Sequence, residues 1–222
     1  MEYRQATLAD LNGLLKLERE AWPKGEGASE EQLKSRINIF PSGVIAAFDN
    51  TTLVGAVMAE IVDLGELTRV RHSWAEISGE GLITTHDERG DVLFGVDLSV
   101  MPSHRKAGIG KGLLLEIGKM AIRRNLKGGV LGARMPDYHL HHKDISAEEY
   151  ITKRGDDGKL IDSELRFYER NRLSLIKLIP EYFPDPDSLN YGVLCYWKNP
   201  FYLRNRTLGK IIGSFGALIF KL

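Results

Sequence analysis

The stretch Val92 to Gly112, VLFGVDLSVMPSHRKAGIGKG, combines an apolar strand-like run with a basic, glycine-punctuated turn that leads into a helical pattern. The apolar run ends at Pro102. Gly108 and Gly110 carry no side chains, so consecutive backbone N–H groups can point to one side of the turn. The first turn of the following helix adds unpaired donors and the positive end of its dipole. This pattern predicts a seat for a phosphate or pyrophosphate.

Spacing separates three kinds of phosphate-binding loop. A nucleoside-triphosphate P-loop needs a glycine five positions before its Gly-Lys pair and Ser or Thr after it, but Arg105 and Gly112 occupy those places. A dinucleotide loop needs a third glycine and an acidic residue about 20 positions later. Leu113 and the unacidic segment 128–135 argue against it. The pattern Arg-x-x-Gly-x-Gly after a strand remains, beside the alternative of a plain strand-to-helix turn.

That pattern, Arg105 to Gly110, resembles the coenzyme A pyrophosphate loop of the GNAT superfamily of acetyl-CoA-dependent N-acyltransferases. The resemblance extends from Tyr3 to about Asn199. The opening YRQATLADLNGLLKLE is similar to the first strand and helix of the family, and LRFYERN is similar to its fourth-helix motif. The segments VLGARMPDYH, SAEEY and YGVLCYWKNP resemble acetyltransferase domains that are joined to carbon-nitrogen hydrolases, although no hydrolase is attached here.

The order of elements predicts an α/β (α+β) fold with a mixed sheet and helices on its faces. We expect strands at 3–7, 44–48, 52–62, 92–100, 130–135, 175–179 and 191–197, and helices at 11–17, 29–40, 109–125 and 164–173. Gly128-Gly129 is expected to end the third helix, and 65–90 is expected to be a long loop facing the acceptor. The resemblance implies a mostly antiparallel sheet of about seven strands, splayed between the fourth and fifth.

The resemblance also implies a binding site for acetyl-CoA as co-substrate. Backbone N–H groups of the loop would hold the pyrophosphate. The preceding strand would bend at a bulge near Leu98 to Val100, where the N–H of Val100 would stabilise the thioester oxyanion. The residues expected to bind the cofactor are Leu98, Ser99, Val100, Arg105, Lys106, Ala107, Gly108, Ile109, Gly110, Lys111 and Asn171.

Catalysis of amine acylation needs an acid for the departing thiolate and a base for the amine. The resemblance points to Tyr168 as the acid, since a phenol can donate a proton to a thiolate. Asp97 in the fourth strand and Glu76 in the preceding loop are our candidates for the base. The carboxylates Glu60, Asp63 and Glu80 remain alternatives, and so does a chain of water molecules.

The segment DYHLHHKD contains His139, His141 and His142, which invites a metal hypothesis. The spacing lacks a carboxylate or thiol at a recognised interval, and zinc sites need three or four protein ligands. We therefore expect no metal, and place this segment near the acceptor entrance.

Composition limits the class of protein. The 222 residues include 30 basic and 30 acidic side chains, so no overall field favours nucleic acid as a partner. A single cysteine, Cys195, excludes an internal disulfide. The N-terminus MEYRQATLAD lacks the apolar core of a signal peptide. We expect a cytoplasmic protein with a GNAT domain at 1–200 and a helical tail at 201–222.

The tail is basic and amphipathic. It carries Arg204, Arg206, Lys210 and Lys221 without an acidic residue. Its apolar stripe comprises Leu208, Ile211, Ile212, Phe215, Leu218, Ile219 and Leu222. The stripe fits an anionic membrane surface, a second subunit, or the parent domain itself.

Together these patterns predict an enzyme that moves an acetyl group from acetyl-CoA to a primary amine. The acceptor, the acyl-chain preference and the oligomeric state cannot be read from the sequence. The alternative is a domain of the same fold that binds acyl-CoA as a sensor or scaffold without turnover.

Overall fold

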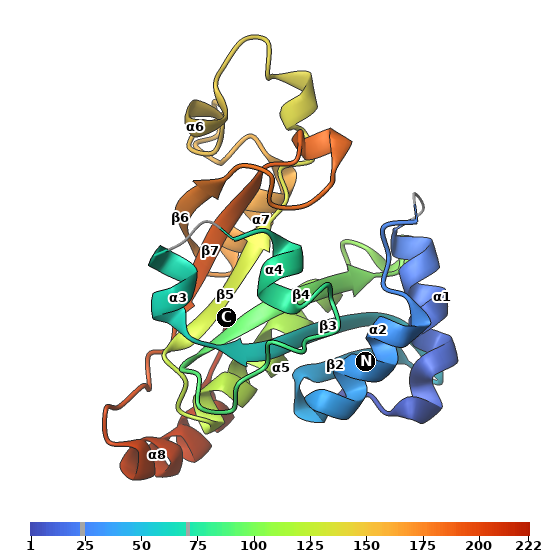
Figure 1. Cartoon of the computed structure of the whole chain (residues 1–222), viewed down its shortest axis with the longest axis vertical. Helices are drawn as coiled ribbons and strands as arrows, with labels where there is room; N and C mark the ends of the chain where they lie inside the picture. The colour runs from blue at the N-terminus through green and yellow to red at the C-terminus, as the bar shows by residue number, and fades with distance from the viewer. Residues whose placement is uncertain (23–24, 70–71) are drawn as a thin grey trace.

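The computed structural model describes residues 1–22, 25–69 and 72–222. Within these ranges a seven-stranded sheet has the order β1-β2-β3-β4-β5-β7-β6 (Figure 1). The strands are β1 Glu2–Gln5, β2 Val44–Asp49, β3 Thr52–Val62, β4 Val92–Val100, β5 Gly128–Ala133, β6 Ser174–Ile179 and β7 Gly192–Lys198. β4 and β5 are parallel, and the other neighbours pair antiparallel. The predicted mixed, mostly antiparallel sheet is confirmed.

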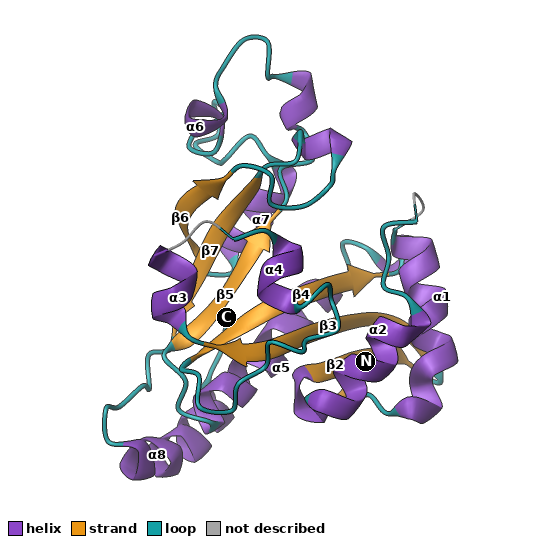
Figure 2. Ribbon diagram, viewed as in Figure 1, coloured by secondary structure: helices purple, strands orange, loops and turns teal. Residues whose placement is uncertain are grey.

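Helices cover both faces of this sheet (Figure 2). They are α1 Leu11–Ala21, α2 Glu30–Ile39, α3 Leu64–Arg69, α4 Trp74–Ser78, α5 Ile109–Arg123, α6 Ala147–Tyr150, α7 Ser163–Arg170 and α8 Arg206–Ile219. The predicted capping of α2 is present, because the Ser29 hydroxyl accepts from the N–H of Gln32 and the Gln32 side chain accepts from the N–H of Ser29. Local sequence therefore sets where this helix begins.

The central strands are buried on both faces. Every residue of β3 after Thr52 is buried, which matches its nearly continuous apolar sequence. On one face, a Cβ at Gly55 would lie 2.9 Å from Ile109 of α5, so the absence of a side chain lets α5 approach the sheet closely. On the other face, the indole of Trp22 at the end of α1 donates a hydrogen bond to the Ser99 hydroxyl of β4 at 2.8 Å. The middle of the sheet is thus held between α1 and α5.

Two local expectations were wrong. The segment 65–90 is not a plain loop, because it contains most of α3 and all of α4. The helix α5 is ended not by Gly128-Gly129, which belong to β5, but by Asn125 in the left-handed conformation at φ 57°. Asparagine tolerates this conformation, and its side chain also bonds both backbone groups of Leu203, at 2.7 and 3.0 Å.

The turn after α7 is left-handed although it contains no glycine. Arg172 adopts φ 66°, the left-handed conformation that a glycine would adopt without strain. The main-chain path is kept because the N–H of Leu173 still donates to the carbonyl of Tyr168 at 3.1 Å. The segment Asn171-Arg172-Leu173 therefore forms this turn without a glycine.

The tail helix α8 packs on α5 through its small residues and not through its apolar stripe. Gly209, Gly213, Gly216 and Ala217 are buried, and a Cβ at Gly213 would lie 2.2 Å from the carbonyl oxygen of Ile122. Large apolar side chains face outward, with Phe215, Leu218 and Ile219 each at least 70% exposed. The alternative in which the whole stripe packs on the parent domain is therefore wrong. Within the described ranges, no helix combines the length and apolarity that crossing a membrane would require.

Candidate functional site

The loop between β4 and α5 has a backbone geometry that suits an anion. Lys106 at φ 67° and Gly108 at φ 82° are both left-handed, so the chain coils around an outward-facing concavity. Across the described part of the chain, none of the backbone N–H groups of residues 106–111 donates to a protein acceptor; the first N–H of α5 that does is that of Gly112, to Gly108 at 3.0 Å. Six consecutive donors at the start of a 15-residue helix thus have no acceptor in the described part of the chain.

The two glycines of the loop have different roles. A Cβ at Gly108 would meet nothing within 4 Å, so glycine is favoured there by its backbone angle. A Cβ at Gly110 would lie 3.2 Å from the ring of Phe167, so glycine there lets α7 approach α5. Arg105 folds back toward Val100 and Ala21, donating to their carbonyls at 3.4 Å. Lys106 and Lys111 are exposed beside the free donors.

Strands β4 and β5 separate beside this loop. They pair only from Leu93–Gly129 to Gly95–Leu131, and β4 continues alone to Val100. The bulge that bends β4 lies at Val96, where the pairing with β3 jumps from Gly95 to Asp97. It is therefore earlier than the expected Leu98–Val100, and the indole of Trp74 in α4 donates to the Val96 carbonyl at 2.9 Å.

The splayed edge of β4 exposes the backbone of two of the three expected residues. The N–H of Met101 donates to Val54 of β3 at 2.9 Å. Because successive residues of a strand point their backbone groups to opposite edges, Ser99 also faces β3, whereas Leu98 and Val100 face the opening. The hydroxyl of Ser99 is bonded to Trp22 and donates to Asp97 at 2.8 Å, which leaves Leu98 and Val100 as the candidates for thioester contacts.

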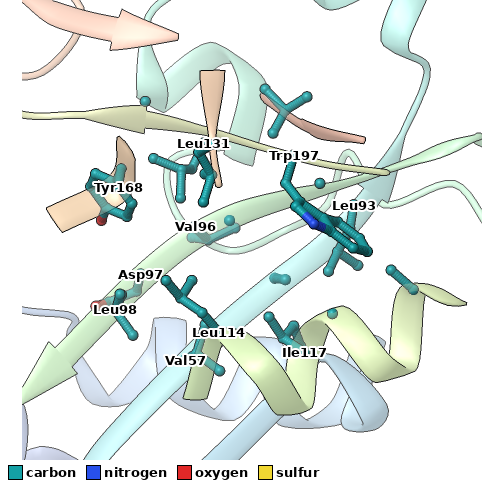
Figure 3. Close-up of a pocket in the computed structure, with 18 of the residues that line it drawn as sticks. Val57, Leu93, Val96, Asp97, Leu98, Leu114, Ile117, Leu131, Tyr168 and Trp197 are labelled. Carbon is teal, nitrogen blue, oxygen red and sulfur yellow. The ribbon is translucent and has the colours of Figure 1, made fainter. Parts of the chain in front are cut away.

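A cavity of about 130 Å³ begins at this opening and continues between the sheet and α5 (Figure 3). Tyr168 and Asp97 lie toward one side of the view and Trp197 toward the other, with Leu114 and Ile117 of α5 between them. The polar lining residues are Trp22, Asp97, Arg134, Glu164 and Tyr168. The rest of the lining is mostly aliphatic, aromatic or glycine.

Tyr168 is buried and lines this cavity. Burial is the main cause that raises its pKa well above the usual 10.0, and nearby Glu164 adds to the effect. The hydroxyl therefore keeps its proton through the physiological range. Within the described residues this hydroxyl has no hydrogen-bond partner, so it is available to bond a ligand.

The two proposed bases are placed differently. The Asp97 carboxylate lines the cavity but is already bonded by Ser99 at 2.8 Å and Arg36 at 3.4 Å. Glu76 does not line the cavity; its exposed carboxylate accepts the N–H of Ser73 at 2.9 Å and caps α4, which lowers its pKa. The structure therefore does not bring Glu76 to the site.

Behind Asp97 lies a second buried carboxyl group, that of Glu18 in α1. One Glu18 oxygen accepts the N–H of Ala28 at 2.9 Å. The other oxygen has no hydrogen-bond donor within reach in the described part of the chain. Burial and the charge of Asp97 raise the pKa of Glu18 far above 4.5. A proton on Glu18 that bonds to Asp97 accounts for this arrangement.

Sequence reasoning missed Glu164, which lines the cavity one helical turn before Tyr168. Burial raises its pKa to about 7, and the opposing charge of Arg134 limits the shift. Arg134 is held by Asp185 through two hydrogen bonds of 2.8 Å. The i, i+4 spacing of Glu164 and Tyr168 was the available signal, since it places both side chains on one helix face.

The remaining expected residues do not add ligands to the cavity. Asn171 is buried at the end of α7, where its amide donates to the carbonyl of Phe167 at 2.8 Å. His139 bonds the backbone of Pro136 at 2.9 Å, in the segment that extends past the end of the sheet near α6 (Figure 1). Among the described residues, no three His, Cys, Asp or Glu side chains are grouped so as to hold a metal ion.

Three comparisons with known proteins bear on this geometry. The model of the acetyltransferase (GNAT) family matches residues 11–143. The uncharacterized N-acetyltransferase YkwB of Bacillus subtilis is 36% identical over 203 residues, which cover 90% of this chain and 89% of that protein. The probable hydrolase YhcX of the same organism is 29% identical over 93% of this chain, but the chain spans only 40% of that protein's length.

Among solved structures, the GNAT-like decarboxylase GphF in complex with isobutyryl-CoA has a TM-score of 0.77 and 28% identity, over 90% of this chain and 100% of that one. The two chains therefore share one fold over nearly their whole length. The chain therefore belongs to the GNAT acetyltransferase family and is an acyltransferase.

Proposed function

We propose that this enzyme transfers an acyl group from its coenzyme A thioester, acetyl-CoA in the simplest case, to a primary amine. The run of six free N–H groups at residues 106–111, next to an opened sheet edge, carries the proposal. Such donors with the helix dipole suit a pyrophosphate. The pantetheine arm then lies along the opening, where the N–H groups of Leu98 and Val100 polarise the thioester carbonyl.

The protons of the reaction are assigned to two side chains on one face of α7. Glu164 accepts a proton from the attacking amine, because a carboxylate with a pKa of about 7 is a usable base near neutral pH. The amine nitrogen forms a bond to the acyl carbon, and the carbon–sulfur bond breaks. Tyr168 donates a hydrogen bond or its proton to the departing thiolate of coenzyme A.

Replacing Gly108 by valine tests the binding loop. A β-branched residue strains the left-handed conformation at φ 82°, so the loop rearranges and loses donors to the pyrophosphate. We expect the affinity for CoA to fall roughly 100-fold, which corresponds to the loss of about two charge-assisted hydrogen bonds. Titration calorimetry with CoA measures this.

The matched control is Gly158→Val. Gly158 has φ 72° and equally open space around a Cβ, but lies in a distant loop. It should share the strain and keep the affinity for CoA. Equal affinities of the Gly108→Val protein and the wild type would remove the proposed loop site.

The pH dependence tests Glu164. The base must be ionised, so kcat/KM should rise with pH through about 7. Glu164→Gln should lose this limb and turn over about 100-fold more slowly. Release of the CoA thiol across a panel of primary amines measures both. The control is Glu169→Gln, because the Glu169 carboxylate is exposed and paired with Arg154. An unchanged pH profile in Glu164→Gln would show that another group is the base.

Binding of CoA without thiol release from any amine would instead support a sensor or scaffold.

A second reaction is favoured by one observation, the 28% identity over the full length of a GNAT-like decarboxylase that holds isobutyryl-CoA. Loss of CO2 from a 2-carboxyacyl-CoA generates a thioester enolate, and donors along the opened β4 edge would stabilise it. Incubation with malonyl-CoA and no amine distinguishes the two: decarboxylation yields CO2 and acetyl-CoA, with no free thiol.

A further inference from the structure

The cavity extends beyond the side that holds Asp97 and Tyr168 (Figure 3). Its inner part lies between the sheet and α5. Four lining residues of the cavity are glycines, from β4, α5 and β5: Gly95, Gly118, Gly129 and Gly132. Gly129 leaves the most space open, because a Cβ there would meet no atom closer than 3.9 Å. Trp197, Phe220 and Leu222 also line it.

The far end of the cavity is closed by aromatic rings. Trp197 of β7 and Phe220, which follows α8, lie with ring centroids 5.1 Å apart. A Cβ at Gly118 would lie 3.1 Å from the Phe220 ring, so this glycine lets the ring reach α5. The end of the tail thus forms the floor of the cavity, while Asp97 and Tyr168 lie in its other part (Figure 3).

Size and lining together define what fits. An apolar cavity of roughly 150 Å³ lined by Leu, Ile and Phe stays dry and holds a molecule as large as benzene. The whole cavity here has about 130 Å³, and away from its polar residues its lining is similar. It therefore has room for a short hydrocarbon chain, and water gains few hydrogen bonds there.

We propose that the acyl group carried by this enzyme is a short- to medium-chain aliphatic acyl group of about four to six carbons, whose hydrocarbon end occupies this cavity. The inference rests on the proposed function, since the thioester must lie at the opening between β4 and β5. The chain then extends from the thioester along Gly95 and Gly129 to the floor formed by Trp197 and Phe220. Chain length is limited by that floor.

Calorimetric titration with CoA, acetyl-CoA, hexanoyl-CoA and decanoyl-CoA tests this without knowledge of the acceptor. Each buried methylene is worth up to about fourfold in affinity, and ordering of the chain reduces the gain. We expect hexanoyl-CoA to bind at least tenfold more tightly than acetyl-CoA, and decanoyl-CoA to bind no more tightly than hexanoyl-CoA.

Gly129→Val fills the cavity. A Cβ at Gly129 would lie 3.9 Å from both the Leu93 carbonyl oxygen and the Trp197 ring, which is ordinary contact, so the variant is expected to fold. The preference for hexanoyl-CoA should disappear, while the affinity for acetyl-CoA stays within about twofold of wild type. Gly155→Val, in an exposed loop with similar room for a Cβ, is the matched control and should keep the preference.

Phe220→Ala provides an independent variant, because it removes part of the floor. It should let decanoyl-CoA bind more tightly than hexanoyl-CoA. Equal affinities of wild type for acetyl-CoA and hexanoyl-CoA would overturn the inference and leave the proposed function standing. Absence of binding of CoA and of every thioester would overturn both.

Discussion

Replacing Tyr168 by phenylalanine is expected to lower kcat about 100-fold while KM for the acyl-CoA changes by less than about twofold. The ring keeps its place in the cavity wall, so binding is retained. The hydroxyl is lost, and with it the donor that stabilises the departing thiolate. Burial raises the pKa of this hydroxyl well above 10.0, so the wild-type residue is protonated throughout the pH range of the assay.

Tyr182→Phe is the control for this experiment. Tyr182 is equally buried but packs against Gly132 and Gly192 instead of lining the cavity. Steady-state release of the CoA thiol should therefore be unchanged in Tyr182→Phe. A kcat in Tyr168→Phe equal to that of wild type would exclude Tyr168 as the acid and leave water in that role.

Replacing Glu18 by glutamine is expected to stabilise the protein at pH 8 by on the order of 2 to 4 kcal/mol. Burial and the charge of Asp97 raise the pKa of Glu18 in the folded protein above its unfolded value of 4.5. The folded state then binds more protons than the unfolded state above about pH 4.5. Wild-type stability therefore falls as the pH rises from there through neutral, as far as the raised pKa of the folded state.

Glutamine imitates the protonated acid, because its oxygen can still accept from Ala28 and its amide can donate to Asp97. The stability of Glu18→Gln should match wild type near pH 4.5 and exceed it increasingly toward pH 8. Urea unfolding at several pH values measures the difference. The control is Glu20→Gln, on the same helix, whose side chain is 44% exposed and paired with Lys16. Its free energy of unfolding should depend on pH as that of wild type does. A parallel curve for Glu18→Gln would contradict the shared proton.

Local sequence was enough for the parts of the site that depend on backbone conformation. Gly108 and the start of α5 were predicted because a left-handed glycine before a helix has a short-range physical cause. The seven strands were predicted within a few residues because apolar β-branched runs are local signals. The bulge was placed too late, since its position at Val96 depends on how β3 pairs with β4 and on the bond from Trp74.

The resemblance predicted Tyr168, but no sequence pattern singled out Glu164, although the two residues are one helical turn apart. A carboxylate is usually solvated, and the sequence alone does not show which one is buried. Glu76 and Glu164 could therefore not be told apart. Their difference is tertiary: Glu164 is turned into the cavity, which raises its pKa to about 7, whereas Glu76 caps a surface helix.

The tail shows the same division. Its helical period was plain from the spacing of its apolar residues, but which face meets the domain was not. The structure buries Gly209, Gly213 and Gly216 because helices approach most closely where side chains are absent.

Sequence by itself determined the glycine turn before α5, the approximate extent of the strands and the capped start of α2, since each arises from residues a few positions apart. Tertiary structure alone decided the position of the bulge, the pairing of Glu18 with Asp97, and a cavity whose wall joins β4, β5, α5 and the end of the tail. The physical reason is that burial and packing between distant segments set these features, and neither is encoded in any single stretch of the chain.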